Sequence, residues 1–112
     1  QKFYLKKFDN LKIKTNACFI KIDVEGIDHE VLQGMKNLIL KNKPVILIEY
    51  NHSNFHKIYN FIRNTYDCYR YDVDKNIFIK LKIKEINKLL KGNLLENKYV
   101  KNSVNLFYLP RN

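Results

Sequence analysis

The sequence predicts an α/β fold with a mostly parallel sheet and an antiparallel edge. An apolar, β-branched run from Phe19 to Val24 ends at Gly26, as a buried strand does. A second run, Val45 to Ile48, follows Pro44, a residue that strands tolerate at their start. Between the runs, apolar residues recur with helical spacing. Strand, helix and strand at this spacing form a βαβ crossover, so we expect the two strands to be parallel neighbours.

The helical stripe consists of Val31, Leu32, Met35, Leu38 and Ile39. Gly34 lies in the middle of this helix, where close packing on the sheet would offset its low helix propensity.

The remaining elements are predicted from the same signals. In order, they are an extended piece and polar turn over 1–17, a helix over 55–65, a strand over 68–73, a turn over 74–76, a strand over 77–83, a short helix over 85–90 ended by Gly92, a polar surface loop over 91–103, and a final strand over 103–109 stopped by Pro110. We expect the last strands to pair like a hairpin at a sheet edge.

The composition indicates a globular chain that forms one domain or part of one. It has 112 residues, 46% of them hydrophobic, and no apolar run that approaches the roughly 20 residues of a membrane span. Lys2 to Phe8 mixes lysines with apolar residues and has no apolar h-region, so no signal peptide is visible in this stretch. The first residue is Gln1 rather than Met, so we expect a piece of a longer product. Cys18 and Cys68 have neither metal-ligand nor disulfide-framework spacing, which favours a reduced, cytoplasmic setting.

The net charge of +10 raises the question of an anionic partner. The lysines are scattered along the chain, without a polybasic block, a zinc-finger spacing or an aromatic-basic RNA-binding motif. This pattern argues against nucleic-acid binding. The charge is better suited to solubility, or to drawing an anionic substrate toward a site.

Acidic residues stand where the two strands end. Asp23 and Glu25 close the first strand and Glu49 closes the second. Ligands of open α/β sheets bind at the carboxyl ends of the strands, so these carboxylates predict a site.

Other candidate residues flank this cluster. Lys21 shares a strand face with Asp23, and a lysine in a buried strand requires a partner, as an internal ion pair or within the reaction site. Gly26 permits a sharp turn or a close approach to a ligand. Asp28 offsets the helix dipole or reaches the substrate.

The polar loop after the second strand supplies further candidates. His52 is either a solvated histidine or a general base near neutral pH. Asn51 lies beside it, and Ser53 or Asn54 is expected to cap the next helix. The carboxylates together with Asn51 would also suit a hard divalent cation, but no metal site is predicted.

Several of these segments form a recognisable pattern. It runs Lys21-Ile22-Asp23-Val24-Glu25-Gly26, then Glu30-Val31-Leu32 and Gly34, then Lys43-Pro44-Val45-Ile46 and Ile48-Glu49. This pattern resembles the FkbM family of S-adenosylmethionine-dependent methyltransferases. Phe8-Asp9-Asn10-Leu11 and the final strand, from Asn105 to Pro110, are similar to other family segments. Asp28 stands where the family usually has Glu.

The resemblance implies a partial Rossmann-like class I methyltransferase fold whose N-terminal half is missing. Residues 1–112 would be the C-terminal part of one domain, with a core at 18–73 and 103–110 and a variable loop at about 84–102. S-adenosylmethionine would be the cofactor, and the acceptor would be a hydroxyl of a sugar or another small molecule.

The resemblance also implies that Asp23 and Glu25 lie beside the donor methyl group, with Glu49 on the substrate side. Together with the residues singled out above, this gives the following candidates. The catalytic candidates are Asp23, Glu25, Glu49, Lys21 and His52. Asp23, Glu25 and Gly26 would bind the cofactor, and Asp28 and Asn51 would contact the substrate. The glycine-rich cofactor loop of such folds is absent from this sequence, which has three glycines. The alternatives are therefore an inactive remnant that serves as an interaction module, or a basic module that binds anionic polymers.

Overall fold

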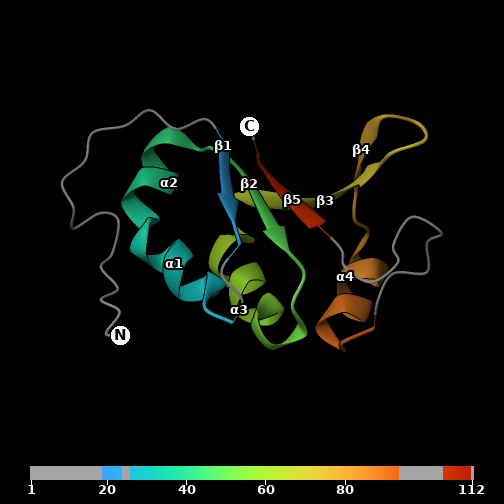
Figure 1. Ribbon diagram of the computed structural model, residues 1–112, viewed down its shortest axis with the longest axis horizontal. Helices are drawn as coiled ribbons and strands as arrows, with labels where there is room; N and C mark the ends of the chain where they lie inside the picture. Colours follow the sequence, from blue (N-terminus) through green and yellow to red (C-terminus); the bar gives the residue numbers. More distant parts are fainter. Residues whose placement is uncertain (1–18, 24–25, 94–104, 112) are drawn as a thin grey trace.

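The computed structural model describes residues 19–23, 26–93 and 105–111 (Figure 1). Within these ranges the chain forms β1 (Phe19–Ile22), α1 (Asp28–Gly34), α2 (Lys36–Asn42), β2 (Val45–Glu49), α3 (His52–Ile62), β3 (Tyr66–Asp72), β4 (Ile77–Lys80), α4 (Ile83–Leu90) and β5 (Asn105–Pro110). The predicted α/β class is confirmed. Among these described helices, none has both the length and the apolar composition needed to cross a membrane.

The described strands form one mixed sheet in the order β1-β2-β5-β3-β4. β1 and β2 are parallel, as the βαβ spacing predicts. The prediction of a mostly parallel sheet is wrong, because β2–β5, β5–β3 and β3–β4 are all antiparallel. β3 and β4 are joined by only residues 73–76, a connection too short for a parallel crossover, so they form a hairpin. β5 inserts between β2 and β3 and runs antiparallel to both. It was expected at a sheet edge, but β4 occupies that edge instead.

The predicted single helix after β1 is broken into α1 and α2. The break falls at Met35, next to Gly34, and the Met35 amide donates to the Leu32 carbonyl at 3.0 Å in a tighter turn. Glycine has a low helix propensity, which explains why the helix ends there. Leu32, Leu38 and Ile39 of the predicted stripe are buried nonetheless. Gly34 is buried as well.

Other element boundaries differ from prediction by a few residues. The largest shift is at α3, which begins at His52 rather than at residue 55 and ends at Ile62 rather than 65. β4 ends at Lys80, so Ile83 begins α4 instead of ending the strand. Gly92, with a φ of +84°, follows α4 as expected of a glycine at a helix end.

The hydrophobic core lies between the helices and one face of the sheet. The strand side chains on this face are Ile20, Ile22, Ile46, Ile48, Leu106, Tyr108, Tyr66 and Cys68. Burial raises the pKa of Tyr66 to about 12, and its hydroxyl donates to the Pro44 carbonyl at 2.6 Å. Side chains of the opposite face alternate with these, and none of the described ones belongs to the buried cluster.

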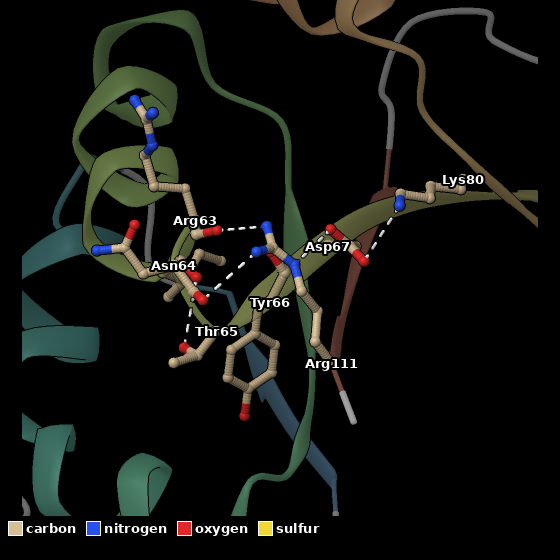
Figure 2. Close-up of polar contacts among 8 residues, drawn as sticks. Arg63, Asn64, Thr65, Tyr66, Asp67, Lys80 and Arg111 are labelled. Atoms are coloured by element: carbon tan, nitrogen blue, oxygen red, sulfur yellow. Dashed lines mark hydrogen bonds and ion pairs between the residues drawn. The ribbon is translucent and has the colours of Figure 1, made fainter.

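Arg111, which follows β5, is hydrogen bonded to the turn between α3 and β3 and to the start of β3 (Figure 2). Its side chain donates to the carboxylate of Asp67 at 2.8 Å and to the carbonyls of Arg63, Asn64 and Tyr66. Lys80 of β4 reaches the other Asp67 oxygen at 3.4 Å. The C-terminal turn of α3 therefore receives a cation where the helix dipole is negative.

Candidate functional site

A pocket of about 210 Å³ opens where β1 and β2 end. It is lined by Lys21, Ile22, Asp23, Leu47, Glu49 and Asn105. The two strands are parallel, and Ile22 pairs with Ile48. The residues that follow, Asp23 and Glu49, therefore emerge side by side at the same edge of the sheet.

The polar groups of the pocket project from the sheet face opposite the core. Lys21 pairs in register with Leu47, and Asp23 and Glu49 lie two residues further along the same face. Lys21, Asp23 and Glu49 are exposed. The pocket is thus open to solvent and supplies two carboxylates and one ammonium group.

The expectation that Lys21 is buried in its strand is wrong. Among the described strands β1 is an edge strand whose Lys21 side faces away from the helices, so the ammonium group keeps its water. Lys21 forms no ion pair with Asp23 or Glu49 in the described part of the chain. The pocket brings the lysine and the carboxylates together without a fixed pair.

Asn105 completes the pocket, and the sequence reasoning did not identify it. It is the first residue of β5 and pairs in register with Glu49. Its side-chain amide adds a donor and an acceptor to the carboxylates. Nothing near Asn105 in the sequence signals this role, because the contact joins positions 49 and 105.

The other two predicted cofactor-binding residues are Glu25 and Gly26. Glu25 lies outside the described residues. Gly26 has a φ of +85°, and a Cβ atom there would meet nothing within 4 Å. The left-handed backbone, rather than close packing, therefore favours glycine at this turn.

Asp28 is not brought to the pocket. It begins α1 and is 4% exposed. Burial raises the pKa of Tyr108 far above its usual range, with smaller contributions from the neighbouring Cys68 side chain and from the charge of Asp28. Asp28 therefore lies on the core side of the sheet, near β5, and not among the pocket-lining residues.

Asn51 and His52 form the start of α3 and do not line the pocket. The Asn51 carboxamide oxygen accepts hydrogen bonds from the Ser53 amide at 3.0 Å and the Ser53 hydroxyl at 2.7 Å. Asn51 is thus the helix cap, and the expected cap at Ser53 or Asn54 is wrong. Asn54 is instead buried, with no hydrogen-bond partner for its amide nitrogen.

His52 packs toward the end of α4. A Cβ atom on Gly92 would lie 3.1 Å from the His52 ring. His52 is exposed, and so is His56, which lies within α3 as expected. Neither histidine is among the residues that line the pocket.

The pocket residues suit hydrogen bonding to a polar ligand. Carboxylates accept protons or hydrogen bonds, and the lysine donates. Across the described residues, no group of three or more His, Cys, Asp or Glu side chains is placed to hold a metal ion. The pocket volume is below the ~300–1,000 Å³ of typical ligand pockets.

Comparison with known protein families identifies a relationship for this chain. The family model described as "Methyltransferase FkbM domain" matches residues 2–71. The match includes Lys21, Asp23 and Glu49 and stops within β3, before Asn105. No curated protein and no solved structure matches the chain.

Proposed function

Because this chain belongs to the FkbM methyltransferase family, we propose that it takes part in S-adenosylmethionine-dependent methyl transfer to a hydroxyl group of a sugar or another small molecule. One observation carries the proposal. Asp23 and Glu49 meet at the carboxyl ends of the parallel β1–β2 pair, within the part of the chain that the family model matches.

The pocket fits the reacting end of such a cofactor. Asp23 and Glu49 are negative and therefore complement a positively charged sulfur, and they are the residues that would hold it. When bound, S-adenosylmethionine supplies a methyl group that its positive charge makes electrophilic. The pocket is too small for the whole molecule. We propose that an N-terminal half of the domain, outside this chain, holds the remainder, and that this chain is the C-terminal part.

The pocket residues have separate tasks in O-methylation. Transfer of a methyl group to the acceptor hydroxyl would require the hydroxyl proton to leave the oxygen. Asp23 or Glu49 takes that proton as general base, and the other carboxylate orients the hydroxyl. Asn105 and Lys21 hydrogen bond to neighbouring acceptor groups. Their placement on three adjacent strands fixes the acceptor relative to the base.

The test compares two proteins: this chain alone, and a longer protein in which the segment encoded immediately upstream is restored (the joined form). We expect S-adenosylmethionine to bind the joined form, by calorimetric titration, and to bind the chain alone weakly or not at all. In the joined form, Asp23→Asn and Glu49→Gln should each lower methyl transfer by about 10²–10⁴ if they act as general base or orienting group. Glu30→Gln, on the exposed side of α1, is the matched control and should leave transfer unchanged.

Other outcomes would contradict the proposal. Absence of cofactor binding in both forms would favour an inactive remnant that serves as an interaction module. Salt-sensitive binding to polyanions, without cofactor binding, would favour a basic anion-binding module.

A further inference from the structure

An aromatic cluster lies on the same sheet face as the pocket. It consists of Tyr71, Phe78 and Phe107, from β3, β4 and β5. The Phe78 ring meets Tyr71 with ring centroids 5.1 Å apart and Phe107 at 5.0 Å, both edge to face. Phe78 is 46% exposed. None of the three rings belongs to the described buried core, although large aromatic side chains normally do, so the cluster is a candidate binding surface.

The cluster is continuous with the pocket. Leu47, which lines the pocket, pairs in register with Phe107, and Phe107 pairs with Tyr69 of the next strand. Asn105 of the pocket and Phe107 of the cluster lie two residues apart on the same face of β5. One surface therefore runs from carboxylates at β1 and β2 to aromatic rings at β3 and β4.

The two ends of this surface recognise different parts of one kind of ligand. The pocket offers hydrogen-bond acceptors and donors for hydroxyl groups, yet each such bond replaces a hydrogen bond to water and therefore adds little net affinity. The aromatic faces carry negative charge density, which attracts the weakly positive C–H groups of a saturated ring. A sugar has hydroxyls on its edge and C–H groups on its faces. Resting on the proposed function, we infer that the methyl acceptor is an oligosaccharide whose further rings stack on Tyr71, Phe78 and Phe107.

The spacing sets the length of that ligand. β2 and β4 are three strand positions apart, or about 14 Å. A ligand that fills the pocket and reaches Phe78 is therefore longer than a single sugar ring, and a monosaccharide would gain little from the cluster.

The test measures saccharide binding to the full chain without cofactor. The probes are glucose, galactose, mannose and rhamnose and a trisaccharide of each, with Kd taken from chemical-shift titrations of the ¹⁵N-labelled chain. At least one trisaccharide should bind about tenfold more tightly than its monosaccharide. Phe78→Ala should remove most of that gain, about three- to tenfold, while leaving monosaccharide binding intact. Phe78→Leu, which keeps apolar area in β4, guards against unfolding and should also lose the gain. Ile83→Ala, 69% exposed on α4, is the matched control and should change nothing.

Three results would overturn the inference. In the first, no trisaccharide binds more tightly than its monosaccharide. In the second, the gain survives both Phe78 variants. In the third, the chain is a dimer by sedimentation and Phe78→Ala makes it monomeric without affecting saccharides, which would make this face an interface between copies.

The outcome is separable from that of the proposed function. If the joined form binds cofactor and transfers methyl groups, but Phe78 does not increase trisaccharide affinity, the proposed function stands and the saccharide surface is refuted. If Phe78 increases trisaccharide affinity but the joined form transfers no methyl group, the saccharide surface stands and the proposed function is refuted.

Discussion

At one end of the sheet, Asp67 of β3 forms ion pairs with Lys80 of β4 and with Arg111, the residue after β5. Burial by itself raises its pKa, but the hydrogen bonds and positive charges of Arg111 and Lys80 outweigh burial and lower the pKa below its usual value. A lowered pKa in the folded state means that the ionised form stabilises the fold. This contribution is complete above the unfolded pKa of about 3.9 and is lost as the pH falls through the folded value.

Asp67→Asn should therefore reduce the free energy of unfolding at pH 6 more than at pH 3. Arg111 is 47% exposed, so we expect roughly 1 kcal/mol at pH 6 from the lost pair and hydrogen bond. Urea denaturation at the two pH values measures the difference. In an Arg111→Met background the same substitution should cost less, because the main partner is gone. An effect of Asp67→Asn that is constant from pH 6 to pH 3 would contradict this account.

Cys68 is a buried thiol, and burial raises its pKa to about 12. The thiolate is the reactive form. In a Cys18→Ser variant, alkylation of Cys68 by iodoacetamide at pH 8 should be roughly a thousandfold slower than for an ordinary thiol, given a usual pKa near 8.5. Mass spectrometry follows the reaction, and denaturant should restore the ordinary rate. Fast labelling of the folded chain would show that β3 opens readily.

At the scale of elements, the segment at the start of α3 has two roles: it caps α3 and it contacts the end of α4. Asn51 caps α3, and the adjacent Tyr50 hydroxyl donates to the Leu89 carbonyl at 2.6 Å, in the last turn of α4. His52 packs toward Gly92 just beyond that turn. The connection after β2 is therefore a docking point for α4, which explains why the polar residues there do not reach the pocket.

Asn51→Ala should destabilise the chain by about 1 kcal/mol, because the Ser53 amide loses its acceptor. Asn51→Asp keeps a capping oxygen and should be close to neutral in thermal denaturation. Asn60→Ala, exposed in the middle of α3, is the control and should be neutral or slightly stabilising. If Asn51→Asp abolishes methyl transfer in the joined form while stability is kept, Asn51 has the predicted substrate role in addition to capping.

At the scale of the whole molecule, β5 joins the sheet together. It pairs with β2 on one side and β3 on the other, and its Leu106 and Tyr108 are almost fully buried. Without it, β1–β2 and β3–β4 would be separate two-stranded ribbons, which are marginal in water.

Removal of residues 105–112 should therefore abolish cooperative folding. Truncating one large buried side chain costs about 2–5 kcal/mol, and a whole domain is stable by only ~5–15 kcal/mol. Circular dichroism should show no sigmoidal thermal transition for residues 1–104, and a synthetic peptide of residues 103–112 should restore one where a scrambled peptide does not. A cooperative transition of 1–104 by itself would show that β5 is dispensable.

Local patterns predicted the parts of the site that local structure builds. The β1–α1–α2–β2 unit is contiguous in sequence, so its spacing was enough to predict that the strands are parallel and that Asp23 and Glu49 lie at one rim. The exposure of Lys21 was not predictable in this way, because alternation gives the face of a residue but not which face the helices cover.

Local sequence patterns were enough to predict the α/β class, the βαβ unit and the acidic rim, because these depend on residues fewer than about 35 positions apart. The strand order, the pairing of Asn105 with Glu49 and the aromatic surface beside them depend instead on contacts between distant parts of the chain. Pairing β5 with β2 closes a loop of more than fifty residues. Burial of Leu106 and Tyr108 offsets the entropy cost of that closure. Because the core around them is built from several helices and strands, no single stretch of sequence predicts this burial.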